Sequence, residues 1–338
     1  MADLRSEYMG IPLKNPLVVG ACSLTAHVDA IKKIEDKGAG AFVIQSLFEE
    51  QIQLQKYKME EQLAANDNLD AEIQNIFPKL EHAGPDEHLM WVRKSKEAVG
   101  IPVIASLNAL SHDTWVEWAK KLEQTGVDGL ELNFFAIPID PKRSAADIEA
   151  EQVETIKAVS AAVNIPISVK LSAFYTSPLE IIKKMDDAGV NGVVLFNRMF
   201  HPSFDIEREK GSFPFNLSNP NDHRMALRFV GLLHENIKAS LCASNGIHSG
   251  SDAVEVLLAG ADVFQCVSTL YLNTIDVIQK ILSDLDAWMT RKGYEKLSDF
   301  RGKLSVNKTP DRWTYRRAQY VKMLLRSDDY IERPSLSE

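Results

Sequence analysis

One ten-residue segment sets the expectation for the whole chain: Gly129-Leu130-Glu131-Leu132-Asn133-Phe134-Phe135-Ala136-Ile137-Pro138. Its apolar residues alternate with Glu131 and Asn133, which predicts a buried β-strand that carries Asn133 to its end. The loop that follows contains no acid, thiol or hydroxyl group. We therefore expect a strand end that binds a ligand through an amide, beside a loop that brings no acid–base group.

The same kind of β-rich run recurs along the chain, and each run is followed by a helical pattern and a glycine. The eight predicted strands span residues 16–22, 41–46, 102–108, 129–135, 166–172, 192–197, 240–247 and 263–268. Helical periodicity is found at residues 113–124, 146–162, 178–187, 222–236 and 251–258. Runs this apolar are buried on both faces, as parallel strands are. Eight βα units predict an α/β protein with a (β/α)8 TIM barrel.

A doubly wound open sheet is the main alternative to the barrel. Such a sheet has no reason to stop at eight strands, and no Gly-x-Gly-x-x-Gly pattern follows the first strand. The barrel is therefore preferred.

Two segments fall outside the repeat. Residues 54–81, rich in Glu, Gln, Asn and Asp, are inserted after the second strand and are either an active-site lid or a solvated surface helix. Beyond a barrel of residues 1–305, residues 306–338 form a helical extension, in which 312–326 predict a basic amphipathic helix. We expect this helix to pack on the barrel or on a second subunit, and we expect a homodimer.

Composition excludes several classes of partner. The chain has 338 residues, 45% of them hydrophobic, and a formal net charge of -9. A protein of that sign repels polyphosphate, so we expect neither a nucleic-acid nor a membrane partner. No apolar run reaches the roughly 18 residues that a membrane span needs, and the N-terminus lacks a signal-peptide core. We expect a cytoplasmic enzyme whose three scattered cysteines are reduced thiols.

In a barrel of this kind the active site lies at the carboxyl ends of the strands. Those ends carry a set of small and polar residues: Gly20, Ala21, Cys22, Gln45, Ser46, Ser106, Asn108, Asn133, Lys170, Asn197, Ser244, Asn245, Gly246, Val267 and Ser268. The set contains no cluster of His, Asp or Glu that would bind a metal. Amides offer both a donor and an acceptor, which suits the edge of a flavin or a pyrimidine.

An anion site is also expected at these ends. Residues 244–246 and the small residues 248–251, which open a helix, offer backbone N–H groups to a phosphate, together with residues 267–269 after the eighth strand. A plain glycine turn and helix cap is the equal alternative.

Lys170 is a cation in the middle of the apolar strand 166–172. Lysine is rarely buried without a partner or a task. It could form a Schiff base, or stabilise the negative charge of a reduced flavin ring. It could instead form a salt bridge with Glu131 on the neighbouring strand. The cofactor role is preferred.

These residues together resemble the dihydroorotate dehydrogenase family over residues 8–305. The resemblance is carried by the motifs 15–17, 131–133, 169–171, 244–247, 250–253, 260–261 and 299–304. It implies a soluble FMN-dependent oxidoreductase that acts on a CH–CH bond of a small molecule in pyrimidine biosynthesis.

The resemblance also implies roles for single residues. Gly20, Ala21 and Cys22 would line FMN through their backbones, with Gln45 and Ser46 nearby, and Asn108, Asn133 and Lys170 would contact its ring. Ser244, Asn245, Gly246, Val267 and Ser268 would hold its phosphate. Asn133 and Asn197 would also face the substrate, with Lys170 and Asn133 as the catalytic residues.

The chain departs from the family where substrate chemistry occurs. The position of the family's Cys or Ser base is Ala136, and the Asn that binds the substrate carboxylate is replaced by Pro138. Gln45 replaces a lysine of the family, and Arg198 replaces a small residue of the family. Tyr175, His201, His112 or Cys22 could supply another base, and Arg198 could bind a carboxylate.

Three functions follow from this pattern. The first is a dehydrogenase for dihydroorotate, or for a related small cyclic or unsaturated substrate, that passes electrons to a soluble acceptor. The second is a phosphate-binding lyase that uses Lys170 as a Schiff base. The third is a flavin-binding protein without turnover.

Overall fold

A computed structural model describes residues 2–54, 84–135, 137–214, 216–311 and 313–326. Eight parallel strands form the centre of the fold: β3 (Leu17–Val19), β4 (Ala41–Val43), β6 (Val103–Asn108), β7 (Gly129–Phe134), β8 (Ile167–Leu171), β9 (Gly192–Leu195), β12 (Ser240–Ser244) and β13 (Val263–Cys266). Neighbours in this order pair with one another, and β13 pairs with β3, which closes the barrel. The short β5 (Leu47–Phe48) adds to β6. The predicted (β/α)8 barrel is confirmed.

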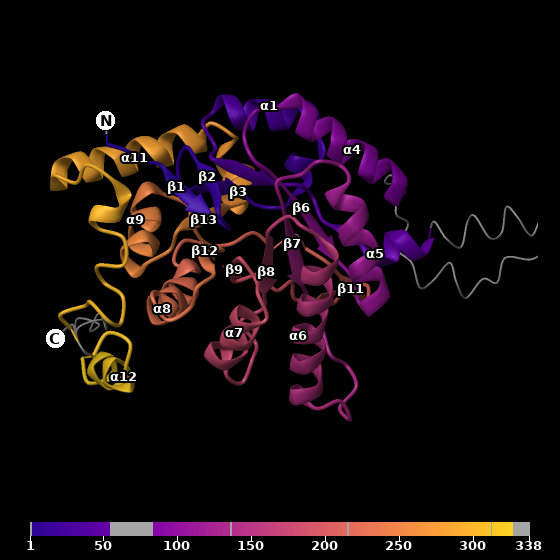
Figure 1. The fold of residues 1–338 in the computed structure, drawn as a ribbon. Coiled ribbons are helices and arrows are strands. Elements are labelled where there is room, and N and C mark those ends of the chain that lie inside the picture. The colour runs from indigo at the N-terminus through magenta and orange to yellow at the C-terminus, as the bar shows by residue number, and fades with distance from the viewer. Residues whose placement is uncertain (1, 55–83, 136, 215, 312, 327–338) are drawn as a thin grey trace, which may run out of the picture.

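The helices form an outer layer around the strands (Figure 1). They are α1 (Val28–Asp36), α4 (Pro85–Ala98), α5 (His112–Glu123), α6 (Ala145–Ala162), α7 (Pro178–Asp187), α8 (His223–Leu233), α9 (Gly250–Ala259), α10 (Ser268–Asn273), α11 (Val277–Lys292) and α12 (Arg317–Leu324), with 3-10 turns η1 (Ser23–Ala26) and η2 (Leu297–Asp299). The predicted helical segments correspond to α5 through α9. Of the helices described, none is both long and apolar enough to span a lipid bilayer.

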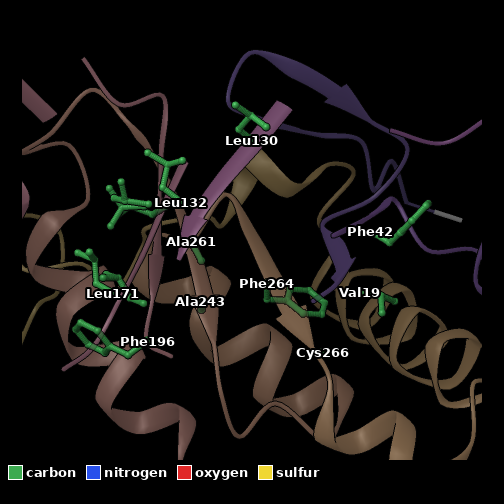
Figure 2. Packing of buried hydrophobic residues seen from close by; sticks show 14 of the residues in the cluster. Val19, Phe42, Leu130, Leu132, Leu171, Phe196, Ala243, Ala261, Phe264 and Cys266 are labelled. Atoms are coloured by element: carbon green, nitrogen blue, oxygen red, sulfur yellow. The ribbon is translucent and has the colours of Figure 1, made fainter. Parts of the chain in front are cut away.

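Alternation along each strand separates two apolar layers. Outward side chains such as Leu130, Leu132, Leu171 and Phe264 belong to one large buried apolar cluster (Figure 2). Burying each such side chain contributes about 1.5–3 kcal/mol. The register places Asn133 directly beside Lys170 on the adjacent strand, and both point inward. Strand alternation thus positions the polar set inside the barrel.

The amino end of the barrel is closed by a hairpin of β1 (Ser6–Tyr8) and β2 (Ile11–Leu13). Tyr8 and Met9 form an inner apolar cluster with strand residues that include Val18 and Cys242. A Cβ on Gly192 would lie 2.8 Å from Met9 Cγ. The inner core therefore fills the amino half of the barrel, and space for a ligand is left at the carboxyl end.

Seven of the eight strands end earlier than predicted, and only β6 ends at its predicted residue, 108. β3 and β4 each stop three residues short, at Val19 and Val43. β9 stops at Leu195 and β12 at Ser244, so residues 196–197 and 245–247 are loop. After β9 the chain makes a long excursion that contains the hairpin β10 (Ser203–Asp205) and β11 (Lys210–Ser212) before α8 begins.

The carboxyl-terminal extension touches the barrel through α8. Tyr315 lies against Gly231, where an added Cβ would be 2.1 Å from its oxygen, and donates a hydrogen bond to the Leu304 carbonyl. Arg228 donates to Gln319 at 2.8 Å. The helix α12 is shorter than the predicted 312–326 and buries no residue. The predicted insertion at 54–81 lies, beyond Leu54, outside the described residues.

Candidate active site

A cavity of about 420 Å³ opens at the carboxyl ends of the strands. All of the predicted site residues line it except Gly20, Ser106 and Asn108. Ser106 instead shares a hydrogen bond of 2.7 Å with the hydroxyl of Ser46. Lining residues predicted from sequence are Ala21, Cys22, Gln45, Ser46, Asn133, Lys170, Asn197, Arg198, Ser244, Asn245, Gly246, Val267 and Ser268. The barrel thus brings together residues that are almost 250 positions apart in sequence.

The end of β7 is held by amides. Asn108 donates to the carbonyls of Asn133 at 2.8 Å and Phe135 at 3.2 Å, so it holds the end of β7 without lining the cavity. Asn197 donates to the side-chain oxygen of Asn133 at 2.7 Å. This pairing directs the Asn133 NH₂ group, and the Asn197 side-chain oxygen, to other partners. The two amides can therefore read a donor and an acceptor on a ligand.

Lys170 lies at the floor of the cavity. Its Nζ donates to Gln265 Oε1 at 3.0 Å and is 3.9 Å from Glu131 Oε1. The salt bridge considered from sequence is present, and Lys170 lines the cavity as well. The two interpretations of this lysine are compatible, because Glu131 lies one step deeper in the barrel than Asn133.

The turn after β12 has an uncommon backbone. Asn245 and Gly246 have φ values of 78° and 72°, in the left-handed region. A Cβ on Gly246 would lie 2.4 Å from the backbone nitrogen of His223. Gly246, Ile247 and Val267 donate their N–H groups to no acceptor among the described residues. These groups form a backbone cradle suited to an anion.

At residues 248–249 the structure shows the helix cap, which was the equal alternative to an anion site. The N–H groups of His248 and Ser249 both donate to the Asp252 carboxylate, at 2.9 Å and 2.8 Å. Ser249 in turn accepts from the Asp252 N–H, which completes a capping box for α9. Residues 248–249 are therefore a helix cap, because a local carboxylate already uses their donors.

Arg198 lines the cavity, and its guanidinium is bound to the excursion between β9 and α8. Its guanidinium donates to Asn216 O at 2.7 Å, Asn216 Oδ1 at 2.8 Å, Asp222 Oδ2 at 2.7 Å and Asn245 Oδ1 at 3.3 Å. Four of its five N–H groups are used in this way. Arg198 therefore ties the excursion to the cradle, and little of it is left for a substrate carboxylate.

A family model described as dihydroorotate dehydrogenase matches residues 3–289. The chain belongs to the dihydroorotate dehydrogenase family. One relative, named dihydroorotate dehydrogenase B (NAD(+)), catalytic subunit, from Methanocaldococcus jannaschii, is 27% identical over 85% of this chain and 93% of its own length. Another, named dihydroorotate dehydrogenase A (fumarate), from Lactobacillus helveticus, is 26% identical over 91% and 100%.

The family expected from the sequence is confirmed, and so is the class of enzyme, an oxidoreductase that acts on CH–CH bonds. Dihydroorotate dehydrogenases generally depend on a flavin. The family's base position, Ala136, lies outside the described residues.

The other candidate bases of this family member do not line the cavity, with one exception. Tyr175 donates to Gln152 at 2.9 Å, and burial raises the pKa of Tyr175 to about 12. His112 is exposed beside Asp113, and His201 is exposed as well. Cys22 does line the cavity, but burial raises the pKa of its thiol. A protonated thiol is a poor base, so none of the four is set up to remove a proton.

Several cavity residues were not predicted from sequence. They are Ser23, Phe48, Phe135, Phe200, Asn216, Leu217, Ser218, Ile247, Gln265 and Tyr271. Gln265 carried a usable signal, since it is a polar residue within the apolar strand 263–268, like Lys170 in its strand. Asn216 and Ser218 carried none, because the distant excursion after β9 places them there.

Proposed function

We propose that this protein is an FMN-dependent oxidoreductase that oxidises or reduces a carbon–carbon bond of a small ring compound. One observation carries the proposal: a single cavity joins an anion cradle at Gly246 to a lysine, Lys170, and to paired amides at Asn133. A phosphorylated flavin presents a phosphate at one end and a heterocyclic edge at the other.

The residues present fit FMN. Gly246 has no room for a side chain, and its N–H with those of Ile247 and Val267 would hold the phosphate. A Cβ on Gly20 would lie 2.8 Å from Val267 and 3.1 Å from Gln265, so glycine there lets the backbone run close to the cavity floor. A cavity of about 420 Å³ is in the range of cofactor pockets, which runs from about 300 to 1,000 Å³.

Bound FMN would accept or donate hydride. The chain's own residues would orient the ring and the substrate around it. Asn133 would donate its NH₂ group to a carbonyl of the ligand, and Lys170 would place positive charge at the ring. Phe48, Phe135 and Phe200 line the outer part of the cavity and would exclude water from the reacting atoms.

The substrate is dihydroorotate, for which the relatives are named, or a related small cyclic or unsaturated compound. Ala136 replaces the family base, which typically contributes about 10²–10⁴-fold. Oxidation of dihydroorotate would therefore be slow unless another group takes the proton.

The decisive experiment begins with the colour of the purified protein. We expect yellow protein that releases FMN on denaturation, with anaerobic dihydroorotate bleaching it slowly or not at all. Rapid bleaching would show that dihydroorotate is a good substrate in spite of Ala136. Colourless protein that takes up no FMN would overturn the proposal, and trapping of Lys170 by borohydride with a carbonyl compound would favour the lyase.

We further propose that the enzyme works in the cytoplasm as a homodimer and that a soluble acceptor reoxidises it. The apolar side chains of α12, with Val321 and Met323 exposed, are a candidate surface for a second subunit. Sedimentation equilibrium would test the dimer, and a single species at 37.8 kDa would contradict it.

A further inference from the structure

Three polar side chains form a chain inside the barrel: Lys170 and Gln265 line the cavity, and Glu131 does not. Glu131 of β7 accepts from Gln265 Nε2 of β13 at 2.6 Å, and Gln265 Oε1 accepts from Lys170 of β8 at 3.0 Å. The exposed fractions are 1% for Glu131, 1% for Gln265 and 7% for Lys170. A buried carboxylate is costly unless it is paired. This cluster therefore requires an explanation in terms of charge.

The direction of the Gln265 amide is fixed by its two neighbours. Turning the amide over would set its NH₂ against the lysine ammonium and its oxygen against the Glu131 carboxylate. The backbone of Gly20 also packs closely against this amide, since an added Cβ there would lie 3.1 Å from Gln265 Oε1. Gln265 is therefore a rigid spacer between a cation and an anion.

The spacer keeps the two charges apart. Lys170 Nζ is 3.9 Å from Glu131 Oε1, and that oxygen has no hydrogen-bond partner among the described residues. A direct ammonium–carboxylate bond would be about 2.7–2.9 Å long. Gln265 thus holds the Lys170 ammonium at the floor of the cavity. Without Gln265, the ammonium would move toward the Glu131 carboxylate.

We propose that Glu131 and Gln265 are positioning residues that set how much positive charge Lys170 presents to the flavin ring. Gln265 keeps the ammonium near the ring, and the negative charge of Glu131 offsets part of its field. Together they set the reduction potential of bound FMN. This inference rests on the proposed function, because it concerns a flavin in the same cavity.

The test uses two variants with opposite expected effects. Glu131→Gln keeps an oxygen that accepts from Gln265 but removes the charge, so the reduced, anionic flavin is stabilised. We expect the equilibrium constant for two-electron reduction to rise about tenfold, which is about 30 mV, and sulfite to bind the oxidised flavin at least tenfold more tightly. Gln265→Met releases Lys170 toward Glu131, and both quantities should change in the opposite direction.

Asp186→Asn is the matched control. Asp186 is a buried carboxylate of α7 that accepts from the N–H groups of Lys238 and Ala239, outside the barrel interior. Its loss should leave potential and sulfite affinity unchanged.

Folded, yellow Glu131→Gln protein with the wild-type potential and sulfite affinity would overturn this inference alone. Wild-type protein that binds no FMN would overturn the proposed function and this inference with it. If Gln265→Met does not fold, the Glu131→Gln comparison still decides the question, because it needs only the isosteric variant.

Discussion

Replacing Lys170 by Met tests the buried Lys170–Glu131 pair and the catalytic role of Lys170 in one set of variants. Met fills similar volume but leaves Glu131 as a buried carboxylate without its cation. At 3.9 Å and an effective dielectric constant near 20, the lost attraction is about 4 kcal/mol. Breaking a buried pair by removing one partner costs about 3–5 kcal/mol. A domain with a stability of about 5–15 kcal/mol should still fold.

The assay combines urea unfolding of flavin-free protein with anaerobic flavin reduction. We expect Lys170→Met to lose about 3–5 kcal/mol, and the double variant with Glu131→Gln to recover most of that loss, because no buried charge is left unpaired. Flavin reduction should stay lost in both. Wild-type stability in Lys170→Met would refute the buried pair, and wild-type reduction kinetics would refute the role of Lys170 at the flavin.

Three further outcomes are expected. Gly246→Ala should weaken FMN binding at least tenfold and lower stability by about 2–4 kcal/mol, since the left-handed conformation costs about 1–2 kcal/mol and the clash with His223 costs more. Gly126→Ala, with φ 86° and nothing within 4 Å of the added Cβ, should lose only the conformational part and keep FMN; equal effects of the two changes would contradict the cradle. Burial lowers the pKa of His88 to about 4, so the unfolded state takes up a proton that the native state excludes. The free energy of unfolding should therefore not depend on His88 titration above pH 6.5, and it should fall by up to roughly 3 kcal/mol as the pH falls to 4. A His88→Leu variant whose stability has the same pH slope would argue against this. Ala136→Cys should speed the bleaching of flavin by dihydroorotate by about 10²–10⁴-fold, as stopped-flow absorbance would show, whereas an unchanged rate would mean that the missing base is not the limiting defect.

Much of the barrel and of its mouth could be predicted because both depend on local alternation. A strand with apolar residues at every second position turns the intervening residues to the opposite face, so Asn133 and Lys170 were placed inside from sequence alone. The same rule would have found Gln265. Strand ends were less predictable: residues 245–247 continue the pattern of β12 but form a turn, because the left-handed backbone at Asn245 and Gly246 ends the ladder.

Sequence patterns alone were enough to predict the succession of strands, the inward-facing side chains, the family and the replacement of the family base by Ala136. The partners of those side chains became known only from the folded barrel. Lys170 donates a hydrogen bond to Gln265, which is 95 positions away in sequence. Arg198 donates its N–H groups to Asn216 and Asp222 instead of a ligand. The physical reason is that alternation is a property of neighbouring residues, whereas a hydrogen bond or an ion pair forms only where closure of the barrel and the path of its loops bring distant residues within about 3 Å of each other.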